Sequence, residues 1–282
     1  MKIIFVCIEN FQEYIIDNIK NLQLFDNRDI TVITNRRYFD RLKQYNIDLY
    51  AIEDLDDLGF NQNNRLDRLF RNGFWMHCSA RFFYLYSYIR KFNIQNIIHL
   101  ENDVMAYINF DKLLPHFKTN KVYAAFDCET RVIPGLLYIP NYTSFCPIIE
   151  NYNYNMNDME NLARFDENII EPLPIIPHGH IENKKYCKNF IDCIYDTAAL
   201  GQYLGGVDKR NMDGDTRGYV NETCVIKYDK YGFFWKKIDG LYVPHLWIDG
   251  NYVRIVNLHL HGKELFKFMA DNPLETKYIP IL

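Results

Sequence analysis

Hydrophobic residues in the first part of the chain occur in two patterns: short continuous runs, and single positions repeated at helical intervals. Residues 2–8 form a short, mostly apolar run, which is typical of a buried strand. Residues 11–24 carry apolar side chains at helical intervals, so a helix is predicted there. Further strands are predicted at 29–34 and 49–52, with a short helix at 38–45 between them. This order of strands and helices is typical of a half-sheet that binds a nucleotide at the carboxyl ends of its strands.

The rest of the chain continues the alternation of strands and helices. Residues 74–92 have the periodicity of a long amphipathic helix, and the apolar run 96–100 is a predicted strand. Later predicted strands are 121–126, 132–140, 169–177, 220–228 and 252–261, and later predicted helices are 157–165, 196–204 and 263–272. The alternation predicts the α/β class, with a Rossmann-like nucleotide-binding half and a mixed central sheet. No linker or internal repeat interrupts it, so we expect one domain, residues 1–282, with two lobes, 1–107 and 108–282.

Composition favours a folded protein that does not bind nucleic acid. Hydrophobic residues make up 48% of the 282 residues, which is enough for a sizeable core. The net charge is −4 and no long basic block occurs, whereas binding to a phosphate backbone needs a basic face. The aromatic share of 16% suits stacking on sugars or bases, but most such rings are expected to fill the core. No G-x-G-x-x-G motif is present, which disfavours a dinucleotide cofactor.

The sequence predicts a cytoplasmic protein. The first apolar run turns polar at Glu9 and Asn10, which is too early for a signal peptide. No run approaches ~18 apolar residues, so no transmembrane helix is expected. The seven cysteines are odd in number and form no Cys-x-x-Cys pair, which favours a reducing compartment. The oligomeric state stays open.

Two acidic residues follow the apolar run 96–100. Glu101 and Asp103 are two positions apart, so at a strand end their side chains point the same way. Carboxylates this close repel each other unless a cation joins them. Hard oxygen ligands at a sheet edge suit Mg²⁺ or Mn²⁺ that carries a phosphate. The pattern therefore predicts a metal and nucleotide site, and the plain alternative is a pair of solvated acids at an exposed strand end.

A second polar set lies near the C-terminus. On a strand, Asn257, His259 and His261 share one face, and two imidazoles there can supply a metal ligand. Gly262 allows the backbone to approach a ligand closely, and Lys263 then offers a charge for a diphosphate. The alternative is a half-buried strand with two surface histidines. Together with the acidic pair about 160 residues earlier, the metal interpretation is preferred.

The order of these features resembles the GT-A glycosyltransferases. That order is a β-α-β start, an arginine-bearing helix, acid-x-Asp, an Asp after a strand, an Asp-led helix and a His near Gly-Lys. The likeness is strongest to the glycogenin and lipopolysaccharide galactosyltransferase type. The phrases HLENDVMAY, DTAALGQYLGGVD and NLHLHGK also resemble glycosyltransferase-like proteins of bacteria and large DNA viruses. The resemblance spans most of the chain and implies a GT-A fold, a nucleoside diphosphate sugar as donor, and Mn²⁺ or Mg²⁺ as cofactor.

The resemblance also implies roles for the residues near the metal. Asp103 would bind the metal directly, and Glu101 would bind the ribose or the metal. The metal histidine falls on His259 by the His-x-x-Gly spacing of the family, and on His261 if adjacency to the glycine matters. His259 is preferred.

Other matching positions would hold the donor. Lys263 would neutralise the diphosphate, with Gly262 beside it. Arg81 falls where the family carries a helix arginine near the donor phosphates or sugar, although a helix-surface arginine is an equal alternative. Ile8 and Asn35 fall at strand ends where a uracil or guanine base normally lies.

Three aspartates are candidates near the reacting sugar. Asp127 would bind the donor sugar, or cap a loop. Asp196 would touch the sugar or act as base, and N-capping of a helix is its alternative role. Asp208 would meet the acceptor or serve as base. Weaker candidates for the acceptor region, for which a solvated loop is the preferred interpretation, are Arg210, Glu222, His178 and His180.

The function predicted from the sequence is transfer of a sugar from a nucleoside diphosphate sugar to a hydroxyl acceptor on a glycan, lipid or protein. A UDP-sugar is the favoured donor, and the choice between a retaining and an inverting reaction stays open. Two alternatives remain. One is a metal-dependent nucleotidyltransferase, which usually has a Gly-rich, basic N-terminal loop that this chain lacks. The other is a non-catalytic carbohydrate-binding protein, which the many aromatic residues would suit.

Overall fold

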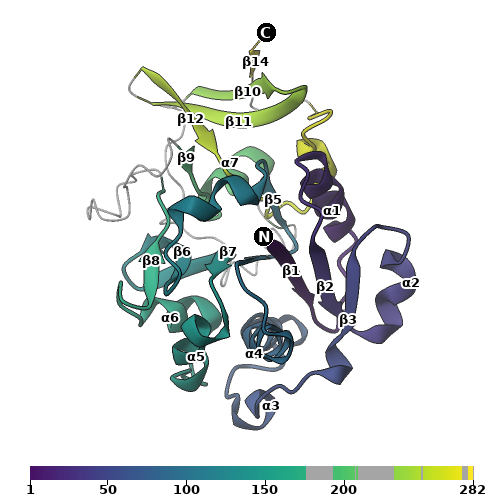
Figure 1. The fold of residues 1–282 in the computed structure, drawn as a ribbon, viewed down its shortest axis with the longest axis vertical. Helices are drawn as coiled ribbons and strands as arrows, with labels where there is room; N and C mark the ends of the chain where they lie inside the picture. Colours follow the sequence, from purple (N-terminus) through teal and green to yellow (C-terminus); the bar gives the residue numbers. More distant parts are fainter. Residues whose placement is uncertain (176–192, 207, 209–231, 249, 275–278, 282) are drawn as a thin grey trace.

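The centre of the protein is a seven-stranded mixed sheet. The computed structural model describes residues 1–175, 193–206, 208, 232–248, 250–274 and 279–281. The strand order is β3-β2-β1-β4-β7-β6-β8 (Figure 1). The first four strands are parallel, whereas β7 runs antiparallel to both β4 and β6. The strands are β1 (Lys2–Cys7), β2 (Ile30–Thr34), β3 (Asp48–Ala51), β4 (Ile97–Leu100), β6 (Val122–Cys128), β7 (Arg131–Ile139) and β8 (Ile170–Pro172).

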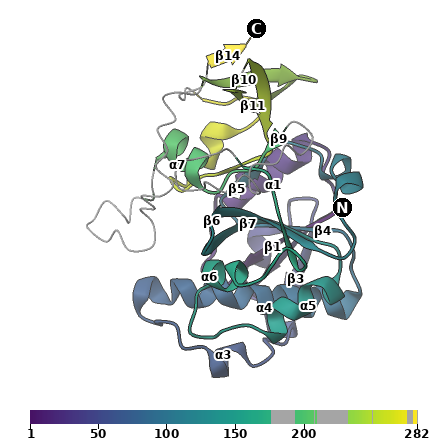
Figure 2. The same cartoon turned by 90° about the vertical axis from the view of Figure 1, so that its left-hand side faces the viewer.

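Helices cover both faces of this sheet. Figure 2 shows α4, α5 and α6 together on one side and α1 on the other. The apolar stripe of α1, formed by Ile15, Ile19 and Leu22, is fully buried, because these residues recur at helical spacing on one face. The helices are α1 (Ile15–Leu24), α2 (Phe39–Leu42), α3 (Phe60–Asn63), α4 (Phe74–Phe92), α5 (Tyr142–Glu150), α6 (Asp158–Ala163) and α7 (Ala199–Gly205).

A second lobe is built on a five-stranded sheet in the order β14-β10-β11-β12-β9, and a two-stranded sheet joins β13 to β5. The second lobe has its own apolar core, with Trp235, Val243 and Leu246 in its middle. The additional strands are β5 (Val104–Ala106), β9 (Cys193–Ile194), β10 (Gly232–Ile238), β11 (Leu241–Ile248), β12 (Asn251–Ile255), β13 (Asn257–His259) and β14 (Ile279–Ile281). The alternation of strands and helices in these sheets confirms the predicted α/β class. The large sheet contains strands from both sides of residue 107, so the division into lobes 1–107 and 108–282, with their separate roles, stays a prediction.

The N-terminal elements confirm most of the sequence-based predictions. The helix predicted over 74–92 has those bounds, and all three N-terminal strands are present. The helix predicted from residue 11 begins only at Ile15. The helix predicted over 196–204 begins at Ala199 and ends at Gly205, with Gly206 as its C-cap.

Two C-terminal predictions are wrong, and a third lies outside the described residues. The single strand expected over 252–261 is two strands in different sheets, because the chain changes sheets at Val256, whose carbonyl accepts the N–H of Tyr107. The helix expected over 263–272 is only a short 3₁₀ turn, Leu265–Phe268. The strand predicted at 220–228 falls among residues that the structure does not describe.

Asparagine side chains of α1 and the following loop occupy the outer edge of β5. The side-chain amides of Asn18, Asn21 and Asn27 donate to the carbonyls of residues 104, 106 and 108 at 2.7, 2.7 and 2.9 Å. The first two are fully buried and the third nearly so. The other edge of β5 pairs with β13. Both edges of this short strand are therefore hydrogen-bonded, as buried backbone groups require.

Among the described helices, none combines the length and the apolar character needed to cross a lipid bilayer. The five cysteines in the described ranges are Cys7, Cys78, Cys128, Cys146 and Cys193, and all five are free thiols.

Candidate metal and substrate site

A cavity of about 810 Å³ opens where β1 and β4 end side by side. The chain leaves β1 toward β2 on one side and later adds β4 on the other. Such a switch point at the carboxyl ends of parallel strands is where α/β proteins bind ligands. The cavity walls come from both lobes: the end of β1, the first turns of α4, the turn after β4, the start of β7, α7 and the segment after β13.

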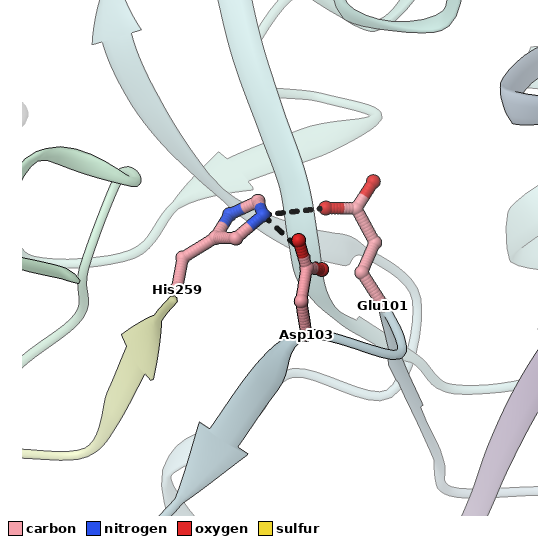
Figure 3. Close-up of side chains that lie close together, drawn as sticks. All are labelled: Glu101, Asp103 and His259. Atoms are coloured by element: carbon pink, nitrogen blue, oxygen red, sulfur yellow. Dashed lines mark ion pairs between the residues drawn. The ribbon is translucent and has the colours of Figure 1, made fainter. Parts of the chain in front are cut away.

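Two carboxylates and an imidazole converge in the cavity wall. Glu101 and Asp103 lie in the turn between β4 and β5, and His259 ends β13. β5 and β13 pair antiparallel with Val104 opposite His259. His259 Nε2 consequently lies 3.2 Å from Glu101 Oε2 and 3.3 Å from Asp103 Oδ1 (Figure 3). The pairing extends to Leu260, whose N–H donates to the Asp103 carbonyl at 2.9 Å.

Burial and charge oppose each other at these groups. Burial would lower the pKa of His259, but the carboxylates of Asp103 and Glu101 outweigh that effect and raise the pKa above its usual value. Burial would raise the pKa of Asp103, but Lys263 and His259 hold the pKa well below its usual value. The position between the two carboxylates therefore favours positive charge.

Arg81 on α4 pairs with one acid of this cluster and with a further acid outside it. Its guanidinium contacts Glu101 and lies 2.6 Å from Asp158 Oδ2. Burial would lower the pKa of Arg81, but Glu101 and Asp158 raise it. Burial also raises the pKa of Asp158 to about 6, against the opposing effect of Arg81. Arg81 thus links the turn after β4 to the start of α6.

Two glycines allow the close packing around His259. A Cβ on Gly201 of α7 would lie 1.9 Å from the carbonyl oxygen of His259, so only glycine allows α7 to approach β13 this closely. A Cβ on Gly135 of β7 would lie 2.9 Å from Nδ1 of the same imidazole. Gly201 therefore allows α7 to pack on the His259 backbone, and Gly135 leaves room for the His259 ring.

The donor set fits a hard divalent cation. One atom from each of Glu101, Asp103 and His259 lies within 4.8 Å of the other two, close enough to share one ion. Two carboxylate oxygens and one imidazole nitrogen suit Mn²⁺ or Mg²⁺ more than a soft metal. Arg81 and Lys263 bind the outward oxygens of the two carboxylates, which fixes the orientation of the potential ligands.

The structure separates the two candidate histidines. His259 belongs to the group of ligand atoms, whereas His261 lies outside it and its Nδ1 is 2.8 Å from Gln202 Nε2. Lys263 lines the cavity and its ammonium group contacts Asp103. Gly262 also lines the cavity, and a Cβ there would lie 2.3 Å from the Gly205 carbonyl oxygen, so its small size serves backbone packing.

The three candidate aspartates lie in different surroundings. Asp196 does not line the cavity; its carboxylate accepts the backbone N–H groups of Leu200, Gly201 and His259, each at 2.8 Å. It therefore has the capping role that the sequence offered as the alternative, reaching past the N-cap to hold α7 on β13. Asp127 is fully buried, pairs with Arg131, and also lies outside the cavity wall. Asp208 is buried and lines the cavity.

The two residues predicted to bind the nucleobase of the donor also differ in whether they line the cavity. Ile8 lines the cavity. Asn35 does not: its side chain accepts the N–H of Glu9 at 2.7 Å and donates to Glu53 at 3.3 Å. The weaker acceptor candidates Arg210, Glu222, His178 and His180 lie outside the described residues.

Sequence reasoning missed one acid at this site. Asp158 is almost completely buried, lines the cavity and is one of the two carboxylates that pair with Arg81. The available signal was indirect, because a buried helix arginine needs carboxylate partners. The sequence analysis placed it only within the helix predicted over 157–165 and gave it no role. The aromatic wall formed by Phe74 and Trp75 was likewise assigned only to the face of a helix.

Neither a protein-family model nor a curated protein matches the chain. Solved structures do match. One is the galactosyltransferase LgtC, solved with donor and acceptor sugar analogues, at 14% identity over 68% of this chain and 85% of that chain (TM-score 0.41). Another is the glycosyltransferase GlyE of Streptococcus pneumoniae, at 15% identity over 60% of this chain and 44% of that chain (TM-score 0.39).

A nucleotidyltransferase also matches. It is a cytidylyltransferase from Leptospira borgpetersenii, at 12% identity over 71% of this chain and 84% of that chain (TM-score 0.40). Glycosyltransferases and a nucleotidyltransferase are thus both among the solved structures that this chain resembles. At these identities and TM-scores the likenesses carry no weight for the activity, which has to be argued from the site.

Proposed function

We propose that the protein is a metal-dependent glycosyltransferase. The donor would be a nucleoside diphosphate sugar, with a UDP-sugar favoured, and the acceptor a hydroxyl on a glycan, lipid or protein. The observation that carries this proposal is the meeting of Glu101, Asp103 and His259 in the wall of the switch-point cavity. These residues come from segments about 160 positions apart, so their meeting is a property of the fold and not of a local motif.

The residues around the cavity suit the charge that develops on a leaving diphosphate. Mn²⁺ or Mg²⁺ bound there would supply Lewis-acid stabilisation of the diphosphate oxygens. Asp103 and His259 would hold the ion, with Glu101 as a further ligand or ribose contact. Lys263 lies at the same wall and would add its ammonium charge to the diphosphate, since cationic groups near a developing anion lower the barrier.

The acceptor side of the proposal rests on Asp208. An inverting transferase needs a carboxylate base beside the acceptor hydroxyl, and Asp208 is the predicted base that lines the cavity. Asp196 is poorly placed to act as base, because it does not line the cavity and its oxygens accept three backbone N–H groups. Fixing the acceptor hydroxyl beside the anomeric carbon would supply a proximity contribution of about 7 kcal/mol or more.

The direct test is a screen of nucleotide sugars for Mn²⁺-dependent release of the nucleotide. We expect release with at least one UDP-sugar. Asp103→Ala should reduce the rate at least about a hundredfold, because it removes a ligand and the partner of Lys263. A variant that keeps the wild-type rate would contradict the proposal.

Thermal shift separates the proposal from its alternatives. A ligand that binds only the folded state raises the unfolding temperature. Stabilisation by UDP and Mn²⁺ together, beyond either one alone, supports a transferase. A shift with free glycans and none with nucleotides would instead indicate a carbohydrate-binding protein. A nucleotidyltransferase would respond to a nucleoside triphosphate and a sugar phosphate; the β1–α1 connection, residues 8–14, has none of the glycine and basic residues usual there.

A further inference from the structure

The two carboxylates of the metal site have matching contacts but different electrostatic surroundings. In each carboxylate, one oxygen faces His259 and the other contacts a positively charged side chain. That side chain is Arg81 for Glu101 and Lys263 for Asp103. Among the ion pairs of the described residues, Lys263 has Asp103 as its carboxylate partner, whereas Arg81 has a second partner, Asp158.

This second acid changes the charge balance on one side of the site. Asp103 and Lys263 sum to zero, whereas Glu101, Arg81 and Asp158 sum to −1. All three side chains of the second group are at most 15% exposed, so water screens their charges poorly. The net negative charge beside Glu101 exists only because Asp158 offsets Arg81.

The position of Asp158 is set by its helix. It is the first residue of α6, and a capping box formed by Asn157 and Glu160 fixes that helix start. α6 packs on β7, the strand that carries Gly135 behind His259. The carboxylate is therefore fixed behind Arg81, within hydrogen-bond distance of its guanidinium.

We propose that Asp158 is a positioning residue that sets the cation affinity of the site through Arg81. It does not bind the cation. By drawing part of the guanidinium charge away from Glu101, it keeps Glu101 available as an anionic ligand. Without Asp158, Arg81 bonds Glu101 alone and neutralises it. This inference rests on the cation site of the proposed function but not on any sugar transfer.

The test measures binding of Mn²⁺ alone to the metal-free protein by titration calorimetry at pH 7.5, where Asp158 is ionised. Asp158→Asn keeps the side-chain shape, removes the charge, and should weaken Mn²⁺ binding about tenfold or more. The double variant Asp158→Asn/Arg81→Gln restores the balance of −1. It loses the contact that orients Glu101, but it should bind Mn²⁺ more tightly than Asp158→Asn alone. If Asp158 acts only in packing, the double variant should bind Mn²⁺ more weakly than Asp158→Asn, because the second substitution disrupts the packing further.

The matched control is Glu171→Gln, which breaks a partly buried ion pair with Lys121 whose two partners both lie outside the cavity wall, and it should leave Mn²⁺ affinity within about twofold. Wild-type affinity in Asp158→Asn, or a double variant weaker than the single one, would overturn the proposal. If Asp158→Asn does not fold, the double variant is compared with Glu101→Gln, which lacks the anionic oxygen: equal Mn²⁺ affinities contradict the charge balance. Sugar transfer is assayed separately. The expected Mn²⁺ affinities without any transfer would contradict the proposed function and leave the role of Asp158 supported.

Discussion

At the scale of single residues, the site depends on which polar atoms are already engaged. Asp196 and Asp208 look alike in the sequence as acids near a predicted helix. The oxygens of Asp196 are bound by three backbone N–H groups, whereas Asp208 lines the cavity. A carboxylate whose oxygens accept three backbone hydrogen bonds is a structural anchor and is not directed at a substrate, although burial raises the pKa of Asp196.

The two histidines give the residue-scale prediction. His259→Gln should weaken Mn²⁺ binding about tenfold or more, because it removes the nitrogen that faces both carboxylates. His261→Gln is the matched control and should change the affinity less than about threefold, since that ring lies outside the ligand group. Calorimetric titration with Mn²⁺ checks both. Equal losses in the two variants would show that the ligand assignment is wrong.

At the scale of elements, the site depends on how closely α7 approaches β13. Gly201 and Gly205 lie one helical turn apart on α7 but face different surroundings. A Cβ at Gly201 would overlap the His259 carbonyl, whereas a Cβ at Gly205 would meet only ordinary contacts at 3.4 Å.

This contrast predicts opposite outcomes for two alanine substitutions in one helix. Gly201→Ala should lower the free energy of unfolding by about 3 kcal/mol, because α7 must move off β13. Gly205→Ala should be neutral or stabilise the protein by up to about 1 kcal/mol, since alanine favours helix. Urea denaturation measures both. Similar values for the two variants would show that α7 does not pack as described.

Features that depend on neighbouring residues could be predicted from the sequence, whereas features that depend on contacts between distant segments could not. The strands and helices before residue 107 follow local apolar spacing, and they are found close to their predicted bounds. Glu101, Asp103 and His259 were candidates from their residue types and a family resemblance, and the structure brings them together. The change of sheet at Val256 was not readable, because a continuous apolar run has the same pattern whether it pairs with one sheet or two.

The role of Asp158 was equally hidden. Its interactions join three elements that lie far apart in the sequence, α4, the turn after β4 and α6. No local pattern distinguishes an ordinary acid in the first turn of a helix from one that also pairs with a buried arginine. Only the tertiary contact separates the two roles.

At the scale of the whole molecule, the buried acid Asp158 links stability to pH. Burial raises the pKa of this carboxyl from its usual 3.8 to about 6 in the folded protein. The folded state therefore holds this proton to a higher pH than the unfolded chain does. The contribution of the group to stability is fully present below about pH 4 and is lost as the pH rises through about 6.

The difference between wild type and Asp158→Asn isolates this effect. The free energy of unfolding of the wild type, relative to that of the variant, should fall between pH 4 and pH 7. Urea denaturation at several pH values, with a reductant to keep the thiols free, gives both curves. A relative stability that rises over this interval would show that Asp158 titrates below its usual range.

The asparagine row of α1 has a consequence for self-association. A short strand beside an open cavity normally offers unpaired backbone groups to any extended peptide nearby. Here Asn18 and Asn21 bind the carbonyls of residues 104 and 106 on one edge of β5, and β13 pairs with the other edge. The mouth of the cavity can thus stay accessible to small molecules while its strand remains closed to cross-chain pairing and aggregation.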